Sequence, residues 1–528
     1  MSHIGKPPCD DGVIAGDGPV LPCSAAARRW TMVAAILGSS MAFIDGTVVN
    51  VALPALQREL GATAAQAQWI IESYALFLAS LLLVGGALGD RLGRRRIFMA
   101  GTALFTLASI GCAASASADP LIAARALQGV GAALLVPGSL SLISATFPAS
   151  ERGQAIGTWS AFSGIAAAVG PVVGGFLIDH YSWTWAFLMN VPLGLVLLAV
   201  CATKVPESRG AAARGRLDVL GAILATVALA GLVFALIEAP ARGWSAAPVI
   251  GAALSGIVAL TLFFIVEARS PAPMLPLGLF RSADFMGTNL LTLLLYAALG
   301  GGLFFFPLNL IQVQGYGATA AGSALLPFIA IMFLLSRWTG RLVGVVGPRL
   351  PLVAGPLLAA IGFALFAIPG IGGEYWQTFL PAVCVLGFGM AITVAPLTTT
   401  VMNSVGRELA GVASGVNNAV SRAAGLLAIA FFALLMAYRF DTALEARLAA
   451  LELPASVTAA VIDQRHRLAA ITLPDDLDPA AADAIRHAVS QSFVAGFRAV
   501  MLACAALAAL SSLVSAALIG RAPPSGQG

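Results

Sequence analysis

Long apolar runs alternate with short charged segments along most of the chain. Each run is about 20 residues long, which is the length that an α-helix needs to cross roughly 30 Å of hydrocarbon. Helices are the expected spanning form because lipid offers no partner to an unpaired backbone hydrogen-bonding group. The pattern predicts fourteen spans, at residues 30–53, 68–88, 96–116, 119–143, 154–178, 183–202, 217–239, 247–267, 287–310, 320–340, 350–371, 376–400, 412–438 and 494–520.

The composition agrees with this pattern. The chain has 528 residues, of which 59% are hydrophobic and only 10% are charged. A soluble protein of this length needs more charge to cover its surface, so we expect an all-α membrane protein with the lipid bilayer as its main partner. The net charge is only +4, and no feature of the sequence predicts a nucleic-acid partner.

The basic residues gather on one side of the predicted spans. Cytoplasmic loops carry an excess of lysine and arginine, whereas the short loops on the opposite side hold only Arg58 and Arg242. We therefore expect both termini in the cytoplasm and a location in a bacterial inner membrane. The loops assigned to the cytoplasm hold Arg91, Arg94, Arg95, Arg96, Arg152, Lys204, Arg209, Arg214, Arg216, Arg269, Arg281, Arg341, Arg349 and Arg407.

Glycine patterns indicate an internal duplication. Residues 129–131 and 387–389 both read Gly-X-Gly and lie 258 positions apart, and residues 153–157 and 411–415 have the same separation. Repeats of this kind build transporters from two bundles that rock about a site at their interface. The predicted parts are a tail at 1–29, a six-helix bundle at 30–202, a linker with two extra spans at 203–286, a six-helix bundle at 287–520 and a tail at 521–528.

One predicted loop, residues 439–492, is much longer than the others and lies on the outer side. It carries alanine-rich stretches with helical periodicity, which are interrupted by Pro454, Pro474 and Pro479. Because only short loops determine the orientation of a membrane protein, the basic residues of this loop do not contradict the predicted topology. The segment is interpreted either as a periplasmic helical cap or as a docking surface for a partner.

Among the charged residues within the predicted spans, four are candidates for a role in function: Asp45, Glu72, Arg125 and Arg422. A charge at mid-membrane costs about 2.5–3.5 kcal/mol on insertion scales, so each needs a reason. Asp45, deep in the first span, is interpreted as a proton- or cation-coupling acid, with a purely structural hydrogen bond as the alternative. Glu72 either shares this role or lies close enough to the outer interface to stay solvated.

The two arginines have alternative roles as well. Arg125 shares a helical stripe with Gln128 and Gly129, because residues three and four positions apart lie on one helix face. It either tunes a neighbouring carboxyl group or fixes a facing helix through backbone carbonyls. Arg422 is interpreted either as a structural residue or as a residue that lines the substrate cavity.

Two glycine-containing segments predict local geometry. Residues 86–96, between the second and third spans, hold too many charges for hydrocarbon, so we expect a hinge in water whose glycines let two helices turn back closely. In the fifth span, Gly170 and Pro171 precede Gly174 and Gly175. Proline removes a backbone hydrogen bond and bends a helix, so this segment predicts a kink that helps to seal one face of a cavity.

Together these segments resemble the major facilitator superfamily, and within it the fourteen-span drug:proton antiporter branch. The hinge matches the loop signature of the superfamily at Gly86, Leu88, Asp90, Arg91, Gly93, Arg94 and Arg95. Asp45, Thr47, Asn50 and Pro54 match the first-span signature of the branch. The signature implicated in proton transfer is matched by Arg125, Gln128, Gly129 and Gly131, and the antiporter signature associated with export by Gly170, Pro171, Gly174 and Gly175.

The resemblance implies two six-helix bundles with two additional central spans, and proton-driven export of amphiphilic drugs or toxic organic compounds by alternating access. Asp90 and Arg94 would latch the cytoplasmic side against a helix start near Gly411. No metal and no cofactor is expected, and the proton gradient would be the energy source. Candidate cavity residues are Asn50, Gln128, Tyr296, Phe305, Phe328, Asn417 and Arg422, although aromatic side chains in spans also serve packing.

A second interpretation keeps the fold and assigns a dedicated exporter or flippase for one metabolite or lipid. A membrane enzyme or sensor would need a catalytic cluster at one depth or a soluble signalling domain, and the sequence indicates neither. In bacteria with two membranes, relatives can pass substrate to a periplasmic adaptor and an outer-membrane channel, so these are candidate partners. The sequence does not predict an oligomeric state.

Overall fold

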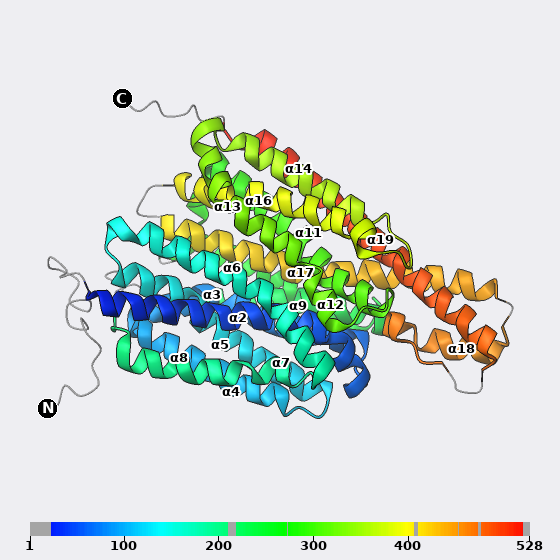
Figure 1. The fold of residues 1–528 in the computed structure, drawn as a ribbon. Helices are drawn as coiled ribbons and strands as arrows, with labels where there is room; N and C mark the ends of the chain where they lie inside the picture. Colours follow the sequence, from blue (N-terminus) through cyan, green and yellow to red (C-terminus); the bar gives the residue numbers. More distant parts are fainter. Residues whose placement is uncertain are drawn as a thin grey trace. The chain divides into compact units, whose positions relative to one another are not determined.

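The computed structural model describes residues 23–209, 218–271, 273–405, 410–451, 453–473 and 477–520, and these residues form helices and short connections without a strand (Figure 1). Fourteen candidate spans occur among them, as predicted. The helices are α2 Ala25–Leu60, α3 Ala64–Leu92, α4 Arg94–Ala113, α5 Ala118–Thr146, α6 Ala149–His180, α7 Trp185–Leu188, α8 Asn190–Lys204, α9 Val219–Arg242, α10 Ala247–Arg269, η1 Leu277–Arg281, α11 Ala283–Gln312, α12 Ala318–Ser323, α13 Leu326–Val346, α14 Arg349–Phe366, α15 Tyr375–Thr378, α16 Leu380–Asn403, α17 Ala410–Ala449, α18 Ala455–Asp463, η3 Arg465–Ala470 and α19 Pro479–Leu518.

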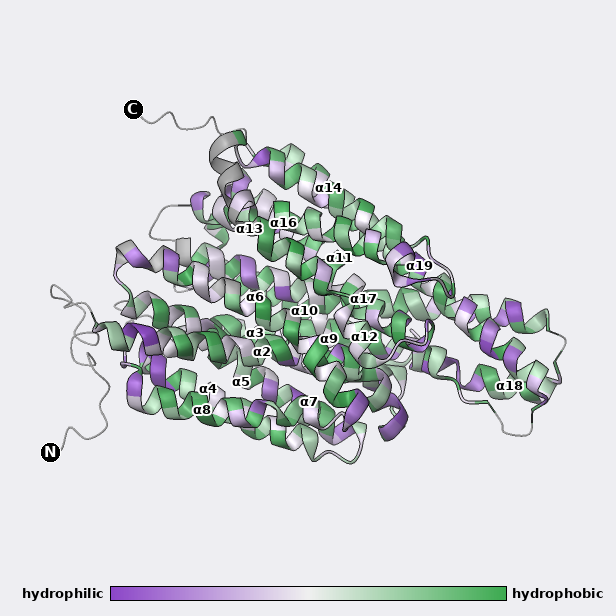
Figure 2. Ribbon diagram, in the orientation of Figure 1, coloured by the Kyte–Doolittle hydropathy of each residue, from purple (hydrophilic) through white to green (hydrophobic). Residues whose placement is uncertain are grey.

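The helices are grouped in two compact units. The first unit comprises the described residues of segments 1–52, 69–229 and 257–276, and the second those of segments 53–68, 230–256 and 277–528. Helices α2, α3, α9 and α10 contribute residues to both units. Apolar residues predominate along the lengths of the helices in Figure 2, as expected for elements that face lipid or one another.

In the first unit, α4 packs along α5 through glycines that bring the two backbones together. A Cβ atom on Gly101 of α4 would lie 2.8 Å from the carbonyl oxygen of Gly131 on α5. A Cβ atom on Gly129 would lie 2.5 Å from the carbonyl oxygen of Tyr74 on α3. Small residues at helix crossings permit such close approach within a membrane, and α5 is thereby held between α3 and α4.

The second unit repeats this arrangement. A Cβ atom on Gly355 of α14 would lie 2.8 Å from the carbonyl oxygen of Gly389 on α16, and one on Gly387 would lie 3.2 Å from Cα of Phe328 on α13. Gly355 follows Gly101 by 254 positions, and Gly389 follows Gly131 by 258. The glycine repeat in the sequence therefore corresponds to a repeat in helix packing, in which α13, α16 and α14 correspond to α3, α5 and α4.

The structure of residues 439–492 differs from the long loop predicted there. Helices α17 and α19 each have 40 residues, which corresponds to about 60 Å at 1.5 Å per residue, roughly twice the hydrocarbon thickness. Much of the segment therefore continues two spanning helices, and the described residues between them form α18, η3 and short connections. Hydrophilic residues are frequent around α18 (Figure 2), which agrees with a position in water.

Candidate functional site

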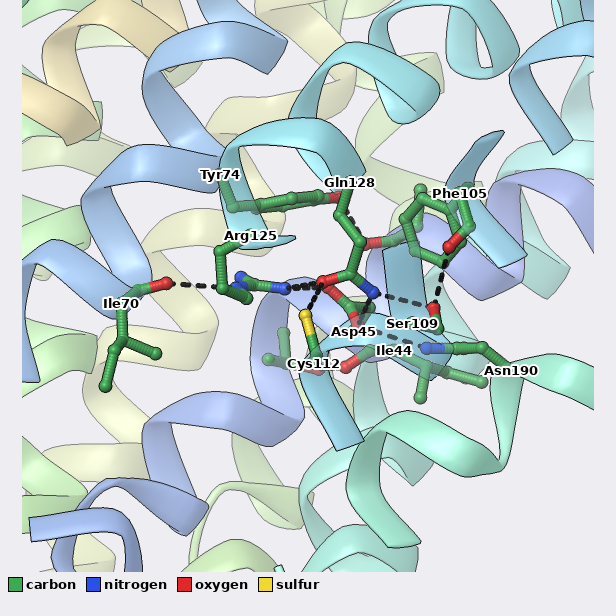
Figure 3. Close-up of polar contacts among 12 residues, drawn as sticks. Ile44, Asp45, Ile70, Tyr74, Phe105, Ser109, Cys112, Arg125, Gln128 and Asn190 are labelled. Atoms are coloured by element: carbon green, nitrogen blue, oxygen red, sulfur yellow. Dashed lines mark hydrogen bonds and ion pairs between the residues drawn. The ribbon is translucent and has the colours of Figure 1, made fainter. Parts of the chain in front are cut away.

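Asp45 of α2 is fully buried, and its carboxylate is surrounded by hydrogen-bond donors within the first unit (Figure 3). Oδ2 accepts a hydrogen bond from the guanidinium of Arg125 on α5. Oδ1 accepts from Nε2 of Gln128 at 3.1 Å and from Nδ2 of Asn190 on α8 at 3.1 Å. Donors from two helices, α5 and α8, thus converge on one carboxylate of α2, and a buried charge with three hydrogen-bond donors can be retained.

Arg125 is 1% exposed and contacts both kinds of group considered for it, a carboxyl group and a backbone carbonyl of a facing helix, whereas its tuning of the carboxyl group stays a prediction. Its guanidinium pairs with Asp45, and its Nε donates to the backbone carbonyl of Ile70 on α3 at 2.9 Å. The guanidinium carbon lies 4.3 Å from the centre of the Tyr74 ring, a distance typical of a cation–π contact. Arg125 therefore balances the charge of Asp45 and ties α3 to α5.

A second layer of polar groups on α4 extends this arrangement. Nε2 of Gln128 also donates to Oγ of Ser109 at 2.7 Å, and Sγ of Cys112 donates to Oε1 of Gln128 at 3.2 Å. All the side chains involved are buried. Figure 3 shows these groups on one side of the Asp45–Arg125 pair, with Ile70 on the other. The resulting hydrogen-bonded network joins α2, α4, α5 and α8.

Asn190, Ser109 and Cys112 were not among the site residues predicted from the sequence. Asn190 begins α8, directly after the short helix α7. An amide inside an apolar span also costs free energy when it is unpaired. Asn190 could therefore have been identified from the sequence on the same ground as the charged residues in the spans.

Glu72 of α3 is also fully buried, so the alternative of a solvated position near the outer interface is wrong. Neither carboxylate oxygen has a hydrogen-bond partner among the described residues. No ion pair or hydrogen bond within the described ranges connects it to Asp45. Glu72 and Asp45 are therefore two buried acids in different environments: within the described part of the chain, Glu72 has no hydrogen-bond partner for its carboxyl oxygens, whereas Asp45 is surrounded by donors.

The hinge is as tight as its glycines predict. Helix α3 ends at Leu92, α4 begins at Arg94, and Gly93 between them has φ 116°. This is a conformation that side-chain-bearing residues rarely adopt. Nε of Arg94 donates to Oδ1 of Asp90 at 2.7 Å, and its Nη1 donates to the carbonyl of Ser141 on α5 at 3.3 Å. Asp90 and Arg94 thus pair within the hinge, and the latch towards Gly411 stays a prediction.

Gly86, Arg91 and Arg95 of the hinge lie in the end of α3 or the beginning of α4. Gly86 lies in the last turns of α3, where an added Cβ would be 3.6 Å from Cβ of Pro137. Arg91 is half-buried near the end of α3. Arg95 directs its Nη1 to the carbonyl oxygen of Val205, at 2.9 Å. The hinge arginines therefore contact different neighbours.

Helix α6 runs through Pro171 and contacts α2 through its glycines. A Cβ on Gly170 would lie 2.6 Å from Oγ1 of Thr47, and one on Gly174 would lie 1.8 Å from Cγ2 of Val48. Gly175 is buried next to this crossing. The glycines place α6 directly against the helix that carries Asp45, and the cavity-sealing role predicted for this segment stays a prediction.

The candidate cavity residues are divided between the units. Asn50 is half-buried on α2, about three turns before the helix ends at Leu60, and belongs to the same unit as Gln128. In the second unit, Nδ2 of Asn417 donates to Oγ1 of Thr292 at 2.7 Å and to Oδ1 of Asn289 at 3.2 Å, which links α17 to α11. The other candidates in that unit are half-buried or buried: Tyr296, Phe305, Phe328 and Arg422.

Comparisons with known proteins agree with this architecture. The family model of the Major Facilitator Superfamily matches residues 35–429. The tetracenomycin C resistance and export protein of Streptomyces glaucescens is 33% identical over 496 residues, which cover 92% of this chain and 91% of that protein. The multidrug resistance protein Stp of Mycobacterium tuberculosis is 36% identical over 456 residues, which cover 85% of this chain and 82% of Stp.

A solved structure shows the same fold. The bacterial homologue of the human lysosomal transporter Spinster, in an inward-facing and unoccupied conformation, has a TM-score of 0.62 and 19% sequence identity. The match covers 95% of this chain and 100% of that one. The chain is a multi-pass membrane protein with the transporter fold, and it belongs to the major facilitator superfamily. Its fourteen spans and its relatives place it in the drug-export branch.

Proposed function

We propose that the protein is a proton-coupled efflux transporter that exports amphiphilic organic compounds by alternating access, with Asp45 as the coupling acid. The observation that carries the proposal is the convergence of Arg125, Gln128 and Asn190 on a carboxylate that is fully buried. An acid in a membrane-spanning helix is costly to bury, which favours a functional reason for its presence. The protein needs no cofactor for this cycle, because the proton gradient supplies the free energy.

Protonation of Asp45 would change the contacts between helices. The charged carboxylate attracts Arg125 and accepts hydrogen bonds from α5 and α8. A neutral carboxyl group loses this attraction and leaves the buried guanidinium without a counter-charge, which is costly in a low-dielectric site. The state of one proton therefore biases the packing of α2 against α5 and α8. An acid that reaches each side of the membrane in turn would couple this bias to substrate release.

Names of the relatives support export as the direction of transport. One relative is named for resistance to and export of tetracenomycin C, and another for multidrug resistance. We infer export of organic compounds from the cytoplasm, with both termini cytoplasmic and the protein in the bacterial inner membrane. In this orientation the outer ends of α17 and α19 face the periplasm, where a periplasmic adaptor with an outer-membrane channel would dock.

The experiment uses the purified protein in proteoliposomes with an imposed pH gradient. Tetraphenylphosphonium, a lipophilic cation, serves as the transported probe, and its binding is measured across a pH series. We expect gradient-driven transport and pH-dependent binding in the wild type, and neither in Asp45→Asn. The matched control is Asp463→Asn, because Asp463 is exposed at the end of α18. Identical pH curves for the wild type and Asp45→Asn would remove Asp45 from the coupling role.

A dedicated exporter or flippase for a single compound is the second candidate function. One observation favours it, because a relative that covers nearly the whole chain is named for one compound, tetracenomycin C. A strain that lacks the gene would be exposed to a panel of toxic dyes and drugs. Increased sensitivity to several unrelated compounds supports multidrug export, and unchanged sensitivity to the whole panel supports a dedicated substrate.

A further inference from the structure

Asp218 and Glu267 bring two carboxyl groups together where the two extra spans meet. Asp218 directly precedes α9, and Glu267 lies in the last turn of α10. Both residues belong to the first unit. Their side chains are close enough for a hydrogen bond between the two carboxyl groups. Two carboxylates repel each other, so this contact requires a physical explanation.

One oxygen of each acid is bound by a backbone amide. Oδ1 of Asp218 accepts a hydrogen bond from the N–H of Gly221 at 2.7 Å, which is the contact that an N-cap residue makes at the start of a helix. Oε2 of Glu267 accepts from the N–H of Leu275, in the connection between α10 and η1, at 2.8 Å. Each acid therefore has one oxygen with a partner and a second oxygen that is left for another contact.

The second oxygens, Oδ2 of Asp218 and Oε1 of Glu267, converge next to Gly221. A Cβ atom on Gly221 would lie 2.7 Å from each of them. Both oxygens are buried, and neither has a hydrogen-bond partner among the described residues. Glu267 as a whole is only 2% exposed. A polar atom that is buried in this way is costly unless it is hydrogen-bonded, so a partner is required between the two oxygens.

Positive charges of the described residues do not supply this partner. Arg269 lies two positions after Glu267 on α10 but forms no ion pair with either acid within the described ranges. Arg214 and Arg216 precede Asp218 in the sequence and lie outside the described residues. A proton shared by two carboxyl groups removes their repulsion and supplies the donor that both buried oxygens lack.

We propose that Asp218 and Glu267 share one proton and thereby form a second proton-binding site, which we call the carboxyl clasp. With this proton in place, one acid donates to the other, and all four oxygens of the pair have partners. The clasp holds the start of α9 to the connection that leads from α10 towards α11. No hydrogen bond or ion pair in the described part of the chain joins it to the Asp45 network. The proposal therefore goes beyond the transport function and does not depend on it.

Loss of the shared proton weakens the clasp. Two negative charges then face each other, and their repulsion opposes the contacts with Gly221 and Leu275. In the unfolded chain both acids lose their protons at about pH 4. Above this pH the folded chain binds one proton more than the unfolded chain, so its stability falls as the pH rises, until the shared proton is lost. In the orientation proposed above, the clasp lies on the cytoplasmic side, and the cytoplasmic pH sets its state.

Infrared difference spectroscopy tests for the proton directly. The absorption of protonated carboxyl groups is compared at neutral pH in the wild type, Asp218→Asn, Glu267→Gln and the double variant. Each amide provides a permanent donor in place of the shared proton, so the remaining acid can stay ionised. We expect both single variants to lose the same band, equivalent to one carboxyl group, and the double variant to lose no more than either.

Two further variants test the geometry. Glu238→Gln is the matched control, because Glu238 also belongs to α9 but pairs with Arg242 at 2.7 Å. A carboxylate beside a positive charge keeps its own charge, so this variant should lose no band. Gly221→Ala would place a methyl group 2.7 Å from both facing oxygens. It should push the acids apart and remove the band although both acids are still present.

The pH dependence gives a second measurement. Thermal unfolding in detergent and hydrogen exchange of the peptide that covers residues 273–278 are followed across a pH series. Variants are compared at equal pH, because the intrinsic exchange rate also changes with pH. Towards alkaline pH, we expect the wild type to unfold at lower temperature than Asp218→Asn and to exchange this peptide about tenfold faster, the factor that corresponds to one hydrogen bond to a charged group. Glu238→Gln should follow the wild type.

Three results would overturn the proposal. A band that is unchanged in both single variants means that both acids are ionised. Separate bands, one lost in each single variant and both lost in the double variant, mean that each acid holds its own proton. A wild type whose pH dependence equals that of Asp218→Asn means that the proton does not control the clasp. If one single variant does not fold, the other variant and the titration of the band in the wild type still decide.

Discussion

Asp45 and Arg125, which lie 80 positions apart in the sequence, form an ion pair that is almost completely withdrawn from solvent. The pair joins α2 to α5, and Arg125 continues to the backbone of α3. Buried pairs of this kind add little net stability, because desolvation of both charges offsets their attraction. We therefore propose that this pair is present in a membrane-spanning region for its role in function and not for stability.

The first prediction follows from the asymmetry between losing one charge and losing both. Arg125→Gln leaves the Asp45 carboxylate buried beside a neutral group, and the expected destabilisation is about 3–5 kcal/mol. The double variant Asp45→Asn/Arg125→Gln leaves a neutral, hydrogen-bonded pair and should be more stable than Arg125→Gln alone. Thermal unfolding in detergent measures both effects. A double variant whose loss equals the sum of the two single losses would contradict the interpretation of a coupled pair.

Asn190 provides the second prediction. Asn190→Ala removes one donor from the Asp45 carboxylate, so we expect a loss of about 1–3 kcal/mol in stability. Asn190→Asp replaces the donor with an acid that faces Asp45, and its effect on transport and on the unfolding temperature should be larger than that of alanine. Asn190→Ser, which can still donate, is the control. Equal behaviour of all three variants would show that the contact with Asp45 has no role.

The number of spans could be predicted from the sequence because hydrocarbon thickness sets a minimum apolar length. The ends of α17 and α19 could not, since a hydropathy pattern marks where a chain leaves lipid and not where its helix ends. Residues 439–449 are rich in alanine, leucine and arginine, which favour helix in water as well. The helix therefore continues beyond the apolar segment.

The same distinction applies to the candidate site. Asp45 and Arg125 could be singled out because a charge in a span is costly, but the sequence does not state which helices are neighbours. Ser109 is a hydroxyl in an apolar helix, and such residues are common because they can bond to their own backbone. Ser109 does so as well, through the carbonyl of Phe105 at 2.8 Å.

Glu72 gives the third prediction. Its carboxyl group is buried and has no hydrogen-bond partner among the described residues, so the fold bears a desolvation cost that a neutral amide would lower. We expect Glu72→Gln to unfold at the same or a higher temperature than the wild type and to transport tetraphenylphosphonium more slowly. A gain in stability combined with a loss of activity is characteristic of a functional residue.

Two controls complete this experiment. Glu151→Gln changes an exposed acid and should alter neither quantity, because half of its side chain is accessible to water. Glu72→Ala removes the side-chain volume as well and should be less stable than Glu72→Gln. Normal transport by Glu72→Gln would assign Glu72 to the structure alone and leave Asp45 as the single candidate acid.

The last prediction concerns the crossing of α2 and α6. On α2 this crossing includes Val48, which is close to Asp45 in the sequence. Gly174→Ala would place a methyl group 1.8 Å from Cγ2 of Val48, whose side chain is fully buried. Overpacking of this kind typically costs about 1–3 kcal/mol, and the separation of α6 from α2 should also reduce turnover.

Gly164→Ala on the same helix is the matched control, because a Cβ there has no neighbour within 4 Å. Alanine at this second position should stabilise α6 slightly through its higher helix propensity. Thermal unfolding and tetraphenylphosphonium transport measure both variants, and equal results for positions 174 and 164 would show that close approach of the two helices is unimportant.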